Sequence, residues 1–169
     1  MNISRNDLTQ QLGKAQSRGW TKIFANAEKR HKLPAGLLLA LASRETNMED
    51  IVGDQGHGRG VFQIDDRFHG DWLAQHGAPG AGTTPRLKDA AEFAAAMIAS
   101  NMVFGRQNGV GGAQLLKFAC SAYNAGAGGA LTGFRNGDSD RTTTGGDYGR
   151  DVLDRLSTIS VNGGRSLAA

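Results

Sequence analysis

The stretch ASRETNMEDIVGDQGHGRGVFQID, residues 42–65, joins the end of an apolar segment to a glycine-rich loop and a second short apolar run. The preceding residues predict a helix, which Pro34 opens in its favoured first-turn position. On that helix Leu38, Leu41 and Glu45 share one face, because residues three and four apart lie above one another. A carboxyl removed from water has a raised pKa and can act as a general acid near neutral pH. The alternative is that the helix ends before Glu45 and leaves this side chain in solvent.

The loop GDQGHGRG, residues 53–60, contains four glycines, which permit unusual backbone angles and a close approach of a ligand to the main chain. It lacks the Gly-Lys-Ser/Thr of a phosphate loop and the βαβ context of a dinucleotide-binding turn. Asp54 and Asp65 bracket the loop, but their spacing is not that of a calcium-binding EF-hand. His57 stands near these acids without the paired spacing of zinc ligands. We therefore expect neither a metal nor a cofactor.

The rest of the chain predicts a mainly α fold. Apolar residues recur at helical spacing in several segments. The helix predicted at 112–125 is expected to stop at Gly126, since glycine commonly caps a helix C-terminus. The only strand signal is GVFQID, residues 60–65, so we expect at most a very short β-hairpin. The predicted helices span residues 20–32, 34–47, 87–104, 112–125 and 147–160. The predicted organisation is an accessory helical segment at 1–19, a main domain at 20–160 and a flexible tail at 161–169.

Composition narrows the class of protein. With 169 residues, of which 39% are hydrophobic, the chain can close one core. A net charge of +3 without any Lys/Arg run argues against nucleic-acid binding, and a weak positive field suits an anionic polymer such as a cell envelope. Cys120 is the single cysteine and lies in an apolar helical segment, which indicates a buried thiol. The first residues lack the apolar core of a signal peptide, and no apolar run is long enough to span a membrane.

Carboxylates without a metal-binding pattern favour acid–base chemistry on a glycosidic bond. In that chemistry one carboxylic acid protonates the leaving oxygen, and a second acidic group activates water or stabilises the oxocarbenium-like centre. The sequence offers Glu45 for the first role, with Asp54 and Asp65 for the second.

The residues that carry this chemistry occur in motifs that resemble the goose-type lysozymes and the related lytic transglycosylases. SRETN and GDQGHGRGVFQID resemble the active-site region of this superfamily, and AYNAG (122–126) and GGDYGRDVLDR (145–155) resemble its later motifs. The four motifs follow the expected order over about residues 20–158. The resemblance implies a single lysozyme-like (goose-type) helical domain with any hairpin beside the active-site cleft. The absence of disulfides fits a bacterial or phage member.

The resemblance also implies roles for individual residues. Glu45 matches the catalytic acid, whereas Asp54 and Asp65 match the aspartates that position the attacking water. The hydroxyl of Tyr148 is expected to support the acid, although core packing is the alternative for each aromatic residue. The link from Glu45 to Asp54 is shorter than in the animal enzymes, so the placement of Asp54 is the open point. The residues expected to bind substrate are Phe62, Gln63, Tyr123, Asn124, Tyr148 and His57.

The implied activity is hydrolysis of the β-1,4 bond between N-acetylmuramic acid and N-acetylglucosamine in peptidoglycan. The first alternative is a lytic transglycosylase, which forms 1,6-anhydromuramyl ends and generally lacks the aspartate pair. The second alternative is a glycan-binding module without catalysis, against which the retained acids argue. We expect a monomer whose partner is the glycan strand, with a small inhibitor or immunity protein as a further candidate. Its place of action would be the bacterial cell wall, reached through a holin, a virion or a secretion system.

Overall fold

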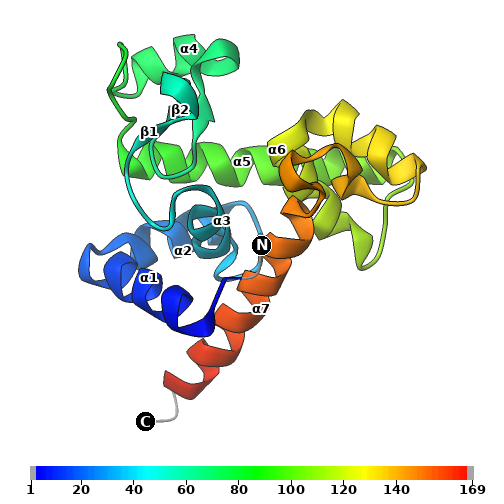
Figure 1. The fold of residues 1–169 in the computed structure, drawn as a ribbon, viewed down its shortest axis with the longest axis horizontal. Helices are drawn as coiled ribbons and strands as arrows, with labels where there is room; N and C mark the ends of the chain where they lie inside the picture. The colour runs from blue at the N-terminus through cyan, green and yellow to red at the C-terminus, as the bar shows by residue number, and fades with distance from the viewer. Residues whose placement is uncertain (1–2, 167–169) are drawn as a thin grey trace.

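Seven α-helices and a small antiparallel sheet form residues 3–166, the part of the chain that the computed structural model describes (Figure 1). The prediction of a mainly α fold with a short β-hairpin is confirmed. The helices are α1 (Arg5–Ser17), α2 (Trp20–Arg30), α3 (Leu37–Thr46), α4 (Asp66–Gln75), α5 (Leu87–Gln107), α6 (Gln114–Arg135) and α7 (Tyr148–Ser166). The strands are β1 (Val52–Gly53), β2 (Gly58–Arg59) and β3 (Ile64–Asp65), and single 3-10 turns lie at Asp54–Gly56, Ser139–Thr142 and Thr144–Gly146.

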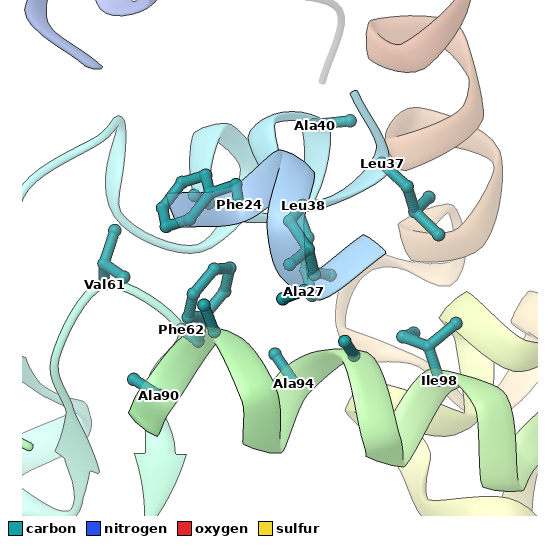
Figure 2. Close-up of a cluster of buried hydrophobic side chains, with 14 of the residues drawn as sticks. Phe24, Ala27, Leu37, Leu38, Ala40, Val61, Phe62, Ala90, Ala94 and Ile98 are labelled. Carbon is teal, nitrogen blue, oxygen red and sulfur yellow. The ribbon is translucent and has the colours of Figure 1, made fainter. Parts of the chain in front are cut away.

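Helix α5 crosses the molecule, and α2, α3 and α6 pack along it (Figure 1). Its alanines Ala90 and Ala94 are fully buried and let α2 and α3 approach closely (Figure 2). The rings of Phe24 on α2 and Phe62 on the β2–β3 connection meet with their centroids 5.1 Å apart. This contact joins the sheet region to the helical core. Buried aromatic side chains contribute strongly to the stability of a core, so the contact helps to hold the sheet in place.

The three strands are only two residues long, yet a polar side chain fixes how they pair. Gly53 on β1 stands opposite Gly58 on β2, and the side chain of Gln63 lies against both glycines. A Cβ atom at either position would come within 2.4 Å of the Gln63 Oε1 atom, so a larger residue there would force the Gln63 side chain to move. The Gln63 amide donates to the carbonyls of Ile51 (3.2 Å) and Gly60 (2.8 Å). Gly53 and Gly58 thus leave room for the Gln63 side chain.

Three elements differ from the prediction. Helix α4 was not predicted, because it is short and its backbone departs from helical angles at His69. Helix α6 is interrupted at Gly126 as expected, with φ 72°, but a further helical segment follows directly to Arg135. Helix α7 continues to Ser166, so residues 161–166 of the predicted flexible tail are helical, since glycine lowers helix propensity without forbidding a helix. The last three residues of that tail lie outside the described residues.

Helix α1 lies within residues 1–19, where a helical segment was expected. The Ser4 hydroxyl accepts a bond from the Asp7 backbone N–H (3.1 Å) and caps the helix. Leu8 and Ala15 bury the inner face of α1 in the main core. None of the helices within residues 3–166 is long and apolar enough to cross a membrane.

Candidate active site

Glu45 lies in the last turn of α3, one residue before the helix ends at Thr46. The alternative that the helix stops before Glu45 is therefore wrong. Leu38 and Leu41 on the same face are fully buried, and the side chain of Glu45 is half-buried. Burial raises the pKa of Glu45 to about 7, although the Tyr148 hydroxyl and the charge of Arg44 act in the opposite direction. A carboxyl with this pKa carries a proton in a large share of molecules at neutral pH.

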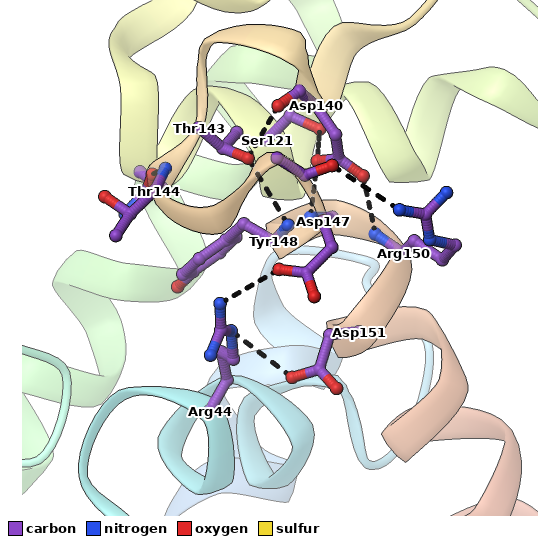
Figure 3. A network of polar contacts seen from close by, with 12 residues as sticks. Arg44, Ser121, Asp140, Thr143, Thr144, Asp147, Tyr148, Arg150 and Asp151 are labelled. Carbon is purple, nitrogen blue, oxygen red and sulfur yellow. Dashed lines mark hydrogen bonds and ion pairs between the residues drawn. The ribbon is translucent and has the colours of Figure 1, made fainter. Parts of the chain in front are cut away.

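Tyr148, the first residue of α7, contacts Glu45 as the sequence predicted. Its hydroxyl donates a short hydrogen bond to Glu45 Oε1, and its ring is buried. The guanidinium of Arg44 lies 5.3 Å from the centroid of that ring. Arg44 also reaches Asp147 (3.3 Å) and Asp151 (3.2 Å), which ties α3 to the first turns of α7 (Figure 3). These contacts fix the position from which Tyr148 meets the acid.

The N-terminus of α7 is itself held by a buried carboxylate, Asp140 (Figure 3). Asp140 accepts hydrogen bonds from the backbone N–H groups of Gly149 (2.7 Å) and Arg150 (3.0 Å). The Ser121 hydroxyl donates to the same carboxylate (2.8 Å). A negative charge at a helix N-terminus satisfies free N–H groups and is favoured by the helix dipole. Asp140 therefore anchors the turn that carries Tyr148.

Asp54 and Asp65 are brought together by Arg67, a residue that sequence reasoning did not identify. The Arg67 Nη2 atom donates to Asp54 Oδ2 (2.7 Å) and to Asp65 Oδ2 (2.6 Å). Its Nε atom and its backbone N–H each donate to Asp65 Oδ1 at 2.9 Å, so Asp65 is also the N-cap of α4. These hydrogen bonds lower the pKa of Asp65. The short link after Glu45 does place Asp54 beside the other acids.

Glu45, both aspartates and Arg67 share one cavity of about 360 Å³, which we call the acidic cavity. Tyr123 and Asn124 on α6 form another part of its wall, as predicted for AYNAG. The Tyr123 hydroxyl donates to the Phe62 carbonyl (2.8 Å), and Asn124 Oδ1 accepts from the Thr144 backbone N–H (2.8 Å). The complete lining is Glu45, Asp54, Gly58, Gln63, Asp65, Arg67, Tyr123, Asn124 and Thr144.

A second cavity of about 660 Å³, the apolar cavity, continues from the first. The two share Gln63, Asp65, Tyr123 and Asn124 in their walls, so they form one groove between the β3–α4 region and helices α5 and α6. Phe68 lies on the wall of the apolar cavity with 79% of its surface exposed. The other residues of this wall are Ile64, His69, Phe93, Met97, Asn101, Ala122, Ala125, Gly126 and Ala127.

Two predicted substrate-binding residues lie elsewhere. The Phe62 side chain is fully buried against Phe24, so the prediction that it lines the sugar groove is wrong. Its main chain still contributes, because the Phe62 carbonyl holds Tyr123. His57 lies outside both cavities, and its Nδ1 atom is 2.8 Å from Asp66 Oδ1. Phe62 was misjudged because an apolar residue beside a loop gives the same sequence signal whether it faces the core or a groove.

In the wall of the acidic cavity, Arg67 and Thr144 are the residues that sequence reasoning did not identify. An Asp-X-Arg sequence at the start of a helix was the available signal for Arg67, since an N-cap aspartate can pair with a side chain two residues later.

Within residues 3–166, no group of three or more His, Cys, Asp or Glu side chains is arranged to hold a metal ion. Comparison with known proteins found no matching family model and no curated protein with significant similarity.

Proposed function

We propose that the protein cleaves the β-1,4 bond between N-acetylmuramic acid and N-acetylglucosamine in peptidoglycan, as a goose-type lysozyme-like muramidase. The observation that carries the proposal is the Glu45 carboxyl, with a pKa of about 7, in the same cavity as two aspartates. General acid catalysis is most effective when the pKa of the acid lies near the working pH. The resemblance of four sequence motifs supports the same activity, and the groove offers room for a glycan on one side of the acids.

In the proposed reaction Glu45 gives its proton to the bridging oxygen while the bond from that oxygen to the anomeric carbon breaks. A water molecule forms the new bond to the anomeric carbon, and its proton passes to an aspartate of the pair. Ionised Glu45 then recovers a proton from solvent, and the protonated aspartate releases its proton to solvent. Asp65, whose pKa is lowered by its hydrogen bonds to Arg67, stays charged throughout.

The ion pairs with Arg67 favour a second candidate, lytic transglycosylation. Both aspartates are paired with the same cation, which occupies carboxylate oxygens that would otherwise be free to hold the attacking water. The C6 hydroxyl of the muramyl residue could then attack the anomeric carbon and close a 1,6-anhydro ring, with its proton passing to the Glu45 carboxylate left after the bridging oxygen is protonated. Glu45 would serve as the acid in both reactions.

Digestion of purified peptidoglycan in heavy-oxygen water tests the proposal and separates the two candidates. Hydrolysis is expected to release fragments whose reducing muramyl ends carry the label, as seen by mass spectrometry. Unlabelled 1,6-anhydro ends would instead identify a transglycosylase. Binding to the wall without any released fragment would contradict both and favour a glycan-binding module.

Replacing Tyr148 by phenylalanine should move the alkaline limb of the pH–activity profile to higher pH. The hydroxyl stabilises ionised Glu45, so its loss raises the pKa of Glu45 further above about 7. Activity that needs protonated Glu45 then persists to higher pH, by about one pH unit for one charge-assisted hydrogen bond. The measurement is the initial rate of wall cleavage across pH. Tyr123→Phe is the matched control, because the Tyr123 hydroxyl bonds the Phe62 carbonyl and its loss should leave the midpoint in place.

A further inference from the structure

The two aspartates of the acidic cavity are bound unequally. Both oxygens of Asp65 accept hydrogen bonds from Arg67, with Oδ1 receiving the backbone N–H and Nε, and Oδ2 receiving Nη2. Asp54 accepts only one, from Arg67 Nη2 to Oδ2. Among residues 3–161, whose side chains the structure describes, no donor is bonded to Asp54 Oδ1. Asp65 is therefore occupied by protein donors, whereas Asp54 keeps one oxygen for a water molecule.

The position of Asp54 depends on Arg67. Asp54 and Gln55 both have left-handed backbone angles, with φ of 47° and 54°, in the turn between β1 and β2. Residues with a Cβ atom are rare in this region, so the surrounding contacts must hold the turn. Within the described part of the chain, Arg67 is the one residue that forms a hydrogen bond or ion pair with the Asp54 side chain. It connects this turn to the first turn of α4.

We infer that Arg67 is a positioning residue that presents Asp54 to the nucleophilic water, and that Asp65 acts by holding Arg67. This inference rests on the proposed hydrolysis. The bond from the anomeric carbon to the bridging oxygen breaks as that oxygen takes the Glu45 proton. The water oxygen forms the new bond to carbon, and the water proton passes to Asp54 Oδ1. Asp65 takes no proton and touches no reacting atom.

A double-mutant cycle tests this division of roles. Arg67→Gln and Asp65→Asn should each slow wall hydrolysis by about 10²-fold, since misplacing a reacting group by about 1 Å costs that much. The double variant should be no slower than Arg67→Gln, because Asp65 has no role once Arg67 is gone. If the two losses multiply, Asp65 acts on the reaction directly and the inference is overturned. Arg86→Gln removes an exposed arginine that pairs with Asp89 outside the groove, and it should retain the wild-type rate.

The pH profile separates positioning from a merely structural role. Arg67→Gln leaves two carboxylates without their cation, which disfavours the ionised pair, so the acid limb of activity should move to higher pH. The other titratable groups near this pair are Glu45 from α3, Tyr123 from α6, and Asp66 and His69 from α4. Arg67→Lys keeps the charge but not the forked geometry, so it should restore the acid limb with a reduced rate.

The outcomes distinguish this inference from the function on which it rests. An Arg67→Gln variant with the wild-type rate and acid limb overturns the inference while wild-type cleavage still supports the muramidase. Wild-type protein that releases no fragments, or only anhydro ends, overturns the hydrolase itself. The side chain of Arg67 is 50% exposed, and equal thermal unfolding midpoints would show that the variants fold.

Discussion

Replacing Glu45 with glutamine is expected to reduce cleavage of purified peptidoglycan by about 10²- to 10⁴-fold, the usual contribution of a general acid. The amide preserves the size of the side chain and can still accept from the Tyr148 hydroxyl, but it cannot give a proton to the bridging oxygen. The measurement is the initial rate of turbidity loss, together with the fragments released. Binding to the wall should persist, because the rest of the groove is unchanged.

Stability provides the control for this variant. The pKa of Glu45 is raised from 4.5 to about 7 in the folded protein, so folded Glu45 binds a proton more tightly than unfolded Glu45 does. The free energy of unfolding of the wild type therefore loses a contribution as the pH rises from about 4.5 to 7. Glutamine lacks this titration, so the variant should be at least as stable above neutral pH. A folded Glu45→Gln protein that cleaves at the wild-type rate would refute the role assigned to Glu45.

Replacing Asp140 with alanine should cause a large loss of stability, about 3 kcal/mol in the free energy of unfolding by urea denaturation. The side chain is fully buried and accepts from two backbone N–H groups and the Ser121 hydroxyl. Alanine leaves these donors unsatisfied inside the protein. Because Gly149 and Arg150 directly follow Tyr148, activity should fall as well.

Asp138→Ala is the matched control for this change. Asp138 lies in the same turn and bonds Lys117 (2.5 Å) and the Asp140 backbone N–H (2.9 Å), but its side chain is 36% exposed. Water can replace much of what is lost there, so the expected cost is about 1 kcal/mol. Equal unfolding midpoints for the two variants would show that Asp140 does not anchor α7.

The helices and the acid could be predicted because their signals are local. Leu38, Leu41 and Glu45 repeat at helical spacing, and the structure places them on one face as expected. The sheet has no such signal, since strands of two residues are too short to show alternation. The geometry of the sheet depends on a contact between Gln63 and two glycines. Helix α4 also lacks a clear sequence signal, because its backbone departs from helical angles at His69.

The acidic residues of the candidate site could be identified from the sequence, whereas several contacts of the residues around them could not. Carboxylates near a glycine-rich loop limit the chemistry, so Asp54 and Asp65 were identified from the sequence alone. The pairing of both with Arg67 depends on how the 54–55 turn folds back onto α4. The direction in which Phe62 points also depends on tertiary packing, and there the prediction was wrong.

The contact between Tyr148 and Glu45 joins residues 103 positions apart, and that between Tyr123 and Phe62 joins residues 61 apart. Contacts of such long sequence separation form late in folding, because the intervening chain must first be ordered. A nascent chain still lacking residue 148 has no hydroxyl to orient the acid, whatever helices it has already formed. The complete site is thus a product of the finished fold, and during synthesis it should assemble only after residue 148 has emerged from the ribosome.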